Sequence, residues 1–115
     1  MPHLLIVDDD PAIRETLAEI GRESGFSVAL AGSVKDALIQ LERHIPDLVL
    51  TDIRLPEGSG MDIFKNDAAA SAEVVVMTGH GTVDNAVQAL RLGATDYLVK
   101  PQRLHGVVQI GRAHV

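Results

Sequence analysis

The sequence contains no cysteine, no long hydrophobic run and no excess of positive charge. The lack of cysteine excludes disulfides, thiolate metal sites and cysteine nucleophiles. A spanning helix needs about 20 consecutive apolar residues, and the N-terminus has no signal-peptide pattern, so we expect a cytoplasmic protein with no membrane partner. With 10 Lys and Arg against 16 Asp and Glu, the net charge is −6. Nucleic acid attracts basic surfaces, so we expect no direct binding of nucleic acid by this chain.

The length and composition of the sequence are those of one globular domain. Its 115 residues are enough for a single hydrophobic core, and 46% hydrophobic with 23% charged residues is ordinary for such a domain. There are no internal repeats, low-complexity tracts or linkers. We therefore expect residues 1–115 to form a single domain.

Short apolar runs alternate with helical patterns along the whole chain. The apolar runs predict strands over 3–7, 27–31, 47–51, 74–77 and 95–99. Helices are predicted from Asp10–Pro11 to Gly25, from Ser33 to Pro46, over 60–67, over 82–92, and from about residue 102. Continuous apolar strands alternating with helices predict an α/β fold, in which helices cover both faces of a five-stranded parallel sheet.

Polar side chains follow four of the five predicted strands. They are Asp8, Asp9 and Asp10 after the first strand, Asp52 after the third, Thr78 after the fourth and Lys100 after the fifth. Each of these residues taken alone has a simpler interpretation as a turn residue, a helix cap or an exposed polar group. Parallel strands end at one edge of the sheet, however, and doubly wound sheets bind ligands there. The convergence of these groups favours a functional site.

The chemistry of these groups suits phosphoryl transfer. Clustered carboxylates repel one another unless a cation lies among them, and Mg²⁺ prefers carboxylate, carbonyl and water oxygens. A carboxylate beside Mg²⁺ can attack phosphorus to give an acyl phosphate. The Lys100 amine and the Thr78 hydroxyl would help to neutralise the charge on the phosphoryl oxygens.

Two aspartates are candidates for the nucleophile. If Asp8 attacks, with Asp10 as acid and base, the chain would be a haloacid-dehalogenase-type phosphatase. That family has the motif D-x-D-x-T, and Ala12 stands here in place of the threonine. If Asp52 attacks, Asp8 and Asp9 become metal ligands. Strand order and spacing alone leave both possibilities open.

Four segments together resemble the receiver domain of two-component response regulators, over about residues 4 to 101. They are Val7–Arg14 (VDDDPAIR), Pro46–Pro56 (PDLVLTDIRLP), Met77–Thr82 (MTGHGT) and Gly93–Pro101 (GATDYLVKP). The TGHGT stretch and the RLPEGSG stretch at 54–60 are most similar to receivers of nitrogen-regulator-type, sigma-54-dependent transcriptional activators. The resemblance implies that Asp52 is the phospho-acceptor. It also implies that Asp9 ligates Mg²⁺ directly, that Asp8 acts mostly through water, and that Asp52 and the Arg54 backbone carbonyl complete the set.

The resemblance assigns roles to residues beyond the metal site. Thr78 and Lys100 would contact the phosphoryl oxygens, and Thr78 and Tyr97 would form the conformational switch. Arg54 and His80 occupy the two variable positions that tune the lifetime of the phosphoryl group. For Tyr97 a half-buried ring at the sheet edge is the alternative, and for Arg54 and His80 a plain exposed position.

At the level of the whole domain, the resemblance implies a flavodoxin-like sheet of order 2-1-3-4-5. A sensor histidine kinase would supply the phosphoryl group, and a surface made by the fourth helix, fifth strand and fifth helix would then change. We expect homodimers on activation, a transcriptional output, and a longer regulator of which this domain is the N-terminal part. The short helix at 60–67 and Gln102, which stands where the family has an aromatic residue, depart from the family pattern. A pseudo-receiver, which keeps the fold without phosphorylation, remains an alternative.

Overall fold

The computed structural model describes residues 1–66, 69, 71–78, 90, 91 and 93–99. Its sheet strands are β1 (His3–Val7), β2 (Ser27–Ala31), β3 (Leu48–Asp52), β6 (Glu73–Thr78) and β7 (Asp96–Val99). Its helices are α1 (Pro11–Glu23), α2 (Val34–Arg43) and the 3-10 helix η1 (Gly60–Lys65). The predicted helices over 82–92 and from 102 fall almost wholly outside the described residues.

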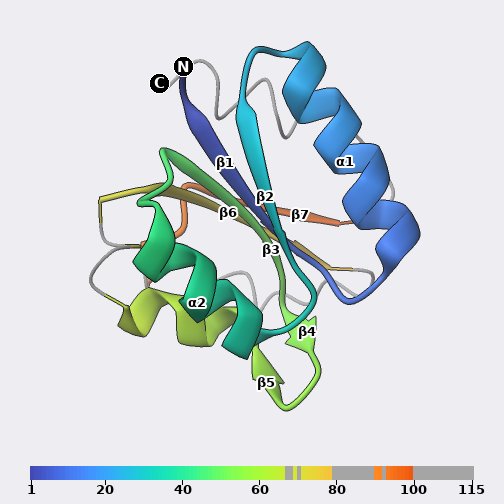
Figure 1. The fold of residues 1–115 in the computed structure, drawn as a ribbon. Helices are drawn as coiled ribbons and strands as arrows, with labels where there is room; N and C mark the ends of the chain where they lie inside the picture. The colour runs from blue at the N-terminus through green and yellow to red at the C-terminus, as the bar shows by residue number, and fades with distance from the viewer. Residues whose placement is uncertain (67–68, 70, 79–89, 92, 100–115) are drawn as a thin grey trace.

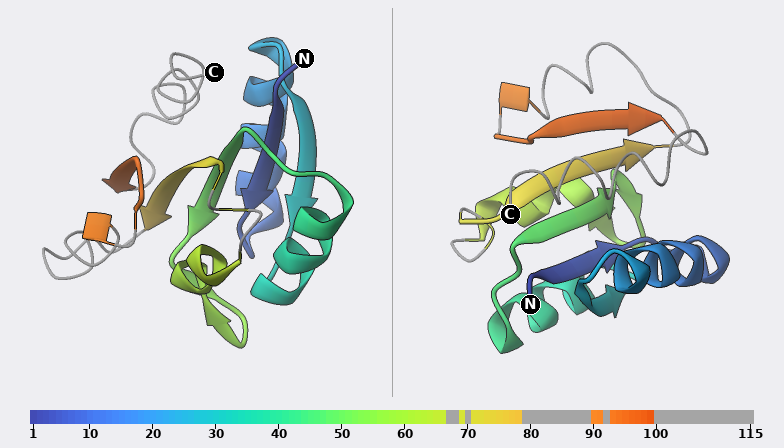
Figure 2. Two further views of the ribbon diagram at one scale, coloured as in Figure 1. Left: turned by 90° about the vertical axis from the view of Figure 1, so that its left-hand side faces the viewer. Right: turned by 90° about the horizontal axis from the view of Figure 1, so that it is seen from above.

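The five strands form one parallel sheet in the order β2-β1-β3-β6-β7. Since β6 and β7 are the fourth and fifth strands of the sequence prediction, the predicted order 2-1-3-4-5 is confirmed. Helix α1 lies on one side of the sheet, whereas α2 and η1 lie on the other (Figures 1 and 2). The predicted covering of both faces is therefore confirmed as well.

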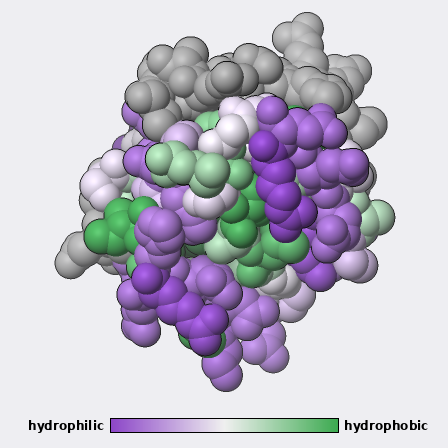
Figure 3. Space-filling model, turned by 45° about the horizontal axis from the view of Figure 1, so that its top comes forward, coloured by the Kyte–Doolittle hydropathy of each residue, from purple (hydrophilic) through white to green (hydrophobic). Residues whose placement is uncertain are grey.

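Alternate residues of each central strand feed two separate cores, one on each face of the sheet. In β1, Leu4 and Ile6 pack with the apolar side of α1, whereas Leu5 and Val7 pack with α2 and η1. Every residue of β1 and β3 is buried. This is why both strands read as continuous apolar runs without polar alternation. Hydrophilic side chains cover most of the described surface in Figure 3, with smaller hydrophobic patches between them.

The boundaries of several elements differ from the prediction by one to three residues. Helix α2 ends at Arg43, short of Pro46, because a proline disfavours helical backbone in the residue before it. Strand β3 runs one residue later than predicted, so that Asp52 is its last residue. In the short helix η1, Met61 and Ile63 are buried, and Phe64 packs partly buried against the same core.

A small antiparallel hairpin between the sheet and η1 was not predicted. It pairs β4 (Arg54–Leu55) with β5 (Gly58–Ser59), and it projects beyond the end of β3 near α2 (Figure 1). Glu57 in its turn has φ of 59°, a left-handed conformation that is uncommon outside glycine. The hairpin leads the chain away from Asp52 and returns it to the same edge of the sheet.

Candidate functional site

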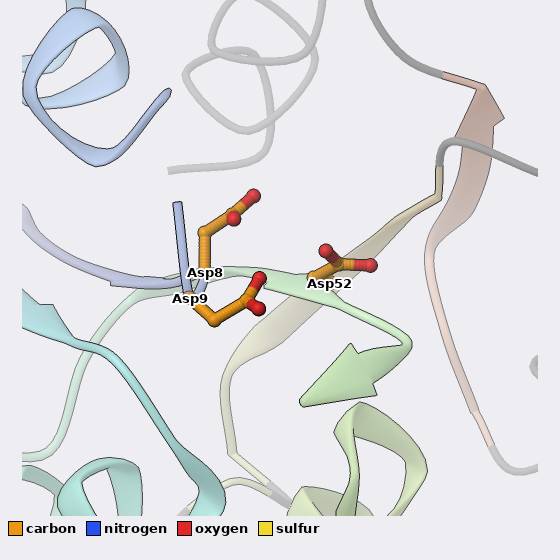
Figure 4. Close-up of side chains that lie close together, drawn as sticks. All are labelled: Asp8, Asp9 and Asp52. Atoms are coloured by element: carbon orange, nitrogen blue, oxygen red, sulfur yellow. The ribbon is translucent and has the colours of Figure 1, made fainter. Parts of the chain in front are cut away.

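Three aspartates form a cluster at the carboxyl edge of the sheet. Asp8 and Asp9 come from the turn after β1, and Asp52 ends β3 (Figure 4). One carboxylate oxygen from each lies within 4.8 Å of the other two. Asp8 and Asp52 are buried, whereas Asp9 is exposed, so the cluster has a closed side and an open side.

The register of the sheet produces this cluster. Val7 pairs with Thr51, so the next residue of each strand, Asp8 and Asp52, leaves the sheet at the same level. At 4.8 Å two unit charges repel by about 3 kcal/mol when the effective dielectric constant is about 20. A divalent cation among the oxygens would offset this repulsion, and a donor set made only of oxygen suits a hard cation. The predicted acid site is therefore physically competent to hold one.

Asp8 is held by hydrogen bonds on three sides. Its amide donates to the Ala31 carbonyl of β2 at 3.0 Å. Its Oδ1 accepts from the Asp10 amide at 2.9 Å, and its own carbonyl accepts from Arg14 Nη1 at 2.7 Å. A carboxylate fixed in this way loses less conformational entropy when it binds a ligand.

Asp10 has a different task from the two acids before it. Its side chain accepts a hydrogen bond from the Ala12 amide at 2.9 Å and caps helix α1, with Pro11 at the first helical position. It is absent from the carboxylate cluster. The predicted helix start at Asp10–Pro11 is confirmed.

The backbone around Asp52 is held by the loop that follows it. The Asp52 carbonyl accepts a hydrogen bond from Thr51 Oγ1 at 3.0 Å, and its Oδ1 accepts from the Arg54 amide at 3.2 Å. Gly60 then packs directly against this point: a Cβ atom built on it would lie 2.0 Å from the Asp52 carbonyl oxygen. The Gly60 amide also donates to the Ile53 carbonyl at 2.8 Å.

The other residues singled out from the sequence are only partly within the described structure. Thr78 is the last residue of β6, the strand next to β3, and Tyr97 pairs with Val76 in β7. Both lie on strands that end at the edge where the carboxylates gather. Lys100 and His80 lie outside the described residues.

Two supporting contacts had no role in the sequence analysis. The bond from Arg14 to the Asp8 carbonyl and the packing of Gly60 on Asp52 both hold backbone atoms of the acid site. Arg14 belongs to the VDDDPAIR segment and Gly60 to the RLPEGSG stretch, so both stood in conspicuous motifs. Their partners, however, are carbonyl groups, which a sequence does not distinguish.

A doubly wound parallel sheet with a cluster of acids at its carboxyl edge defines a class of α/β domain that binds its ligands at that edge. The family model for the response regulator receiver domain matches residues 4–110. The chain therefore belongs to the response regulator receiver domain family, as the sequence motifs predicted. Within the described residues, no helix is both long and apolar enough to cross a bilayer.

The relatives of the chain include proteins named as transcriptional regulatory proteins. The alginate biosynthesis transcriptional regulatory protein AlgB of Pseudomonas aeruginosa is 41% identical over 100 residues, which cover 85% of this chain and 22% of AlgB. Among the first relatives found, this chain spans between about one fifth and one half of the relative's length. The haloacid-dehalogenase alternative finds no support in these matches.

Solved receiver structures have the same fold. A response regulator from Burkholderia pseudomallei, with a phosphorylated aspartic acid, calcium ion and citrate, superimposes with a TM-score of 0.86 and 25% identity; the match covers 99% of this chain and 72% of that one. The solution structure of the beryllofluoride-activated NtrC4 receiver domain dimer gives a TM-score of 0.87 at 28% identity, and the match covers 99% and 98% of the two chains. The flavodoxin-like fold expected from the sequence is thus confirmed.

Proposed function

We propose that the Asp52 carboxylate accepts a phosphoryl group from the phosphohistidine of a sensor histidine kinase. The observation that carries this proposal is the position of Asp52, buried at the end of β3 with Asp8 and Asp9 beside it. One Asp52 oxygen forms a bond to phosphorus while the bond from phosphorus to the kinase imidazole nitrogen breaks. The phosphorylated aspartic acid of the Burkholderia pseudomallei relative supports the same acceptor chemistry.

Mg²⁺ is the cation that we propose for the acid cluster. When bound, it would neutralise charge on the phosphoryl oxygens. Asp9, exposed on the open side of the cluster, would be a direct ligand, and buried Asp8 would act mostly through water. The Asp52 carboxylate and the Arg54 carbonyl would complete the protein ligands; the Arg54 amide already donates to Asp52 Oδ1. Calcium beside a phosphorylated aspartic acid in the Burkholderia pseudomallei protein supports an oxygen-ligated cation.

The remaining roles follow the family pattern. We assign Thr78 and Lys100 to the phosphoryl oxygens, and Thr78 and Tyr97 to the switch. Phosphorylation would bias a two-state equilibrium and change the surface made by the fourth helix, the fifth strand and the fifth helix. Arg54 and His80 would tune the lifetime of the acyl phosphate. These assignments rest on motif positions, and for Thr78 also on its place at the end of β6.

The domain would pass its signal to a transcriptional output in a longer regulator. The lengths of the relatives support this, since the 100 matched residues make up about one fifth to one half of them. The dimeric NtrC4 receiver supports homodimer formation on activation. A chain of net charge −6 would leave nucleic-acid binding to another segment. The cytoplasm is the compartment that fits a kinase-dependent receiver.

Acetyl phosphate with Mg²⁺ tests the acceptor directly. Intact-protein mass spectrometry should show one added phosphoryl group on the wild type and none on Asp52→Asn. Asp47→Asn is the matched control, because Asp47 is an exposed aspartate outside the carboxylate cluster. It should be labelled like the wild type. Labelling that persists in Asp52→Asn but disappears in Asp8→Asn would favour the Asp8 phosphatase, and a wild type that never labels would favour a pseudo-receiver.

A further inference from the structure

Arg14 reaches from the first turn of α1 back to the acid-bearing turn. Its Nη1 lies 2.7 Å from the Asp8 carbonyl oxygen, and the side chain is half-buried. Gly32, at the end of β2, leaves the space that the guanidinium occupies: a Cβ atom on Gly32 would lie 3.1 Å from Nη1. The guanidinium is therefore enclosed between two turns at the carboxyl edge of the sheet.

The carbonyl that Arg14 holds belongs to the peptide unit between Asp8 and Asp9. Because a peptide unit is planar, fixing its oxygen also fixes the direction of the Asp9 amide and the position of the Asp9 Cα atom. On the other side of Asp8, the amide is already held by the Ala31 carbonyl at 3.0 Å. Arg14 thus adds a restraint on the side that leads to Asp9, where the Asp10 amide also donates to Asp8 Oδ1 at 2.9 Å.

Asp9 needs this restraint more than its neighbour does. Its carboxylate is exposed, and no hydrogen bond between residues that the structure describes reaches it. Nevertheless one of its oxygens lies within 4.8 Å of Asp8 and Asp52 oxygens (Figure 4). Its place in the cluster therefore depends on the backbone that carries it.

We propose that Arg14 is a positioning residue for the cation site: it holds the Asp8–Asp9 peptide so that the Asp9 carboxylate faces Asp52. This inference rests on the proposed function, since it takes the acid cluster to be a Mg²⁺ site. Arg14 acts through the Asp8 carbonyl and contacts neither the cation nor the phosphoryl group.

The direction in which Mg²⁺ affinity changes when Arg14 is replaced distinguishes a positioning role from an electrostatic one. A guanidinium repels Mg²⁺, so its charge alone predicts tighter Mg²⁺ binding when Arg14 is replaced by a neutral residue. Positioning predicts the opposite, because an Asp9 carboxylate that is free to rotate loses entropy on binding. Residues that orient metal ligands typically contribute about 10- to 100-fold to metal affinity. Because Arg14 acts through one hydrogen bond and Asp9 is exposed, we expect Arg14→Met to bind Mg²⁺ about 10-fold more weakly, at the low end of this range.

The test is Mg²⁺ titration by isothermal calorimetry on the unphosphorylated chain, together with urea unfolding of each variant. Arg14→Met should raise the Kd for Mg²⁺ about 10-fold, and labelling by acetyl phosphate should approach the wild-type rate at saturating Mg²⁺. Arg14→Lys, which keeps one donor, should show a smaller rise. Arg22→Met is the matched control: Arg22 lies exposed in the last turn of the same helix, and its loss should leave the Kd unchanged.

An unchanged or lower Kd in Arg14→Met would overturn the inference, and so would reduced stability with normal Mg²⁺ affinity. If Arg14→Met does not fold, Arg14→Gln decides: its shorter neutral side chain ends before the position of Nη1, so the Kd should rise, and an unchanged Kd would overturn the inference. The proposed function fails separately, if the wild type binds no Mg²⁺ or Asp52 is never phosphorylated.

Discussion

Gly60→Ala should damage stability and phosphorylation together, because Gly60 packs against the carbonyl of the proposed phospho-acceptor. An added Cβ atom would lie 2.0 Å from the Asp52 carbonyl oxygen and 2.8 Å from Thr51 Oγ1. Gly60 is not among the positive-φ glycines, so its backbone suits an alanine and the cost is purely steric. The first of these contacts is with main chain, which no side-chain rotation can relieve.

The cost is obtained from the contacts that must change. Forcing a methylene-sized group into a packed site costs about 1–3 kcal/mol. The movement also weakens two hydrogen bonds, from Gly60 to Ile53 and from Thr51 to Asp52, each worth about 1 kcal/mol. Replacing glycine by alanine offsets about 0.4–1 kcal/mol of this loss, because alanine lowers the conformational entropy of the unfolded chain. The net loss is about 2–3 kcal/mol, which lowers Tm by roughly 8–15 °C for a domain of this size.

Thermal unfolding and the rate of labelling by acetyl phosphate are the two measurements. Gly25→Ala is the control, because Gly25 has no neighbouring atom within 4 Å but a φ of 95°. It should lose about 1–2 kcal/mol through backbone strain and still be labelled normally at low temperature. Gly60→Ala should be labelled more slowly, since the displaced loop moves Asp52. A Gly60→Ala protein as stable as the wild type would refute the steric argument, and normal labelling despite lower stability would refute the link to Asp52.

Three further predictions concern the cap of α1, the titration of His3 and the binding of Mg²⁺. Asp10→Ala should cost about 1 kcal/mol in urea unfolding through loss of the α1 cap, whereas Asp10→Ser should cost little and both should bind Mg²⁺ normally. Burial, and then the His44 ring stacked at 3.8 Å, lower the pKa of His3 below 6.5, against the opposing effects of Asp47 and Ser27. His3 in the folded state is therefore protonated at a lower pH than in the unfolded state. As the pH drops below about 6.5, the free energy of unfolding measured in urea should decrease, and it should decrease less steeply in His3→Gln. Mg²⁺ at 10 times its Kd should stabilise the wild type by about 1.4 kcal/mol in the same assay, and Asp9→Asn should abolish most of that gain.

The centre of the sheet was predictable from the sequence because β1 and β3 are buried on both faces. The runs at 3–7 and 27–31 match β1 and β2 residue for residue, and the Asp10–Pro11 cap places the start of α1. The end of α2 was less predictable. Pro46 signals that a helix has to stop, but His44 is already extended, with φ of −158° and ψ of 120°. The proline therefore acts two residues earlier than its own position suggests.

The β4–β5 hairpin could not be predicted from hydrophobic pattern, because two-residue strands have no periodicity to detect. Its signal is Pro56 followed by Glu57, since proline favours the first central position of a tight turn. The second central position carries glutamate in a left-handed conformation, where glycine is the usual residue. Sequence statistics would place the turn one residue later, at Gly58. The pairing of Arg54 with Ser59 and of Leu55 with Gly58 fixes the observed register of the hairpin.

In the acid site, the residue types predict which side chains come together, whereas only the fold shows which contacts hold them. Carboxylates after parallel strands must gather at one edge, so the sequence was sufficient to predict that Asp8, Asp9 and Asp52 approach one another. It could not predict what holds them there. Arg14 is six residues from the carbonyl it binds, and the space for its guanidinium comes from Gly32 in another turn. Because such support acts on backbone oxygens, which every residue has, its loss should weaken cation binding although all three aspartates are still present in the chain.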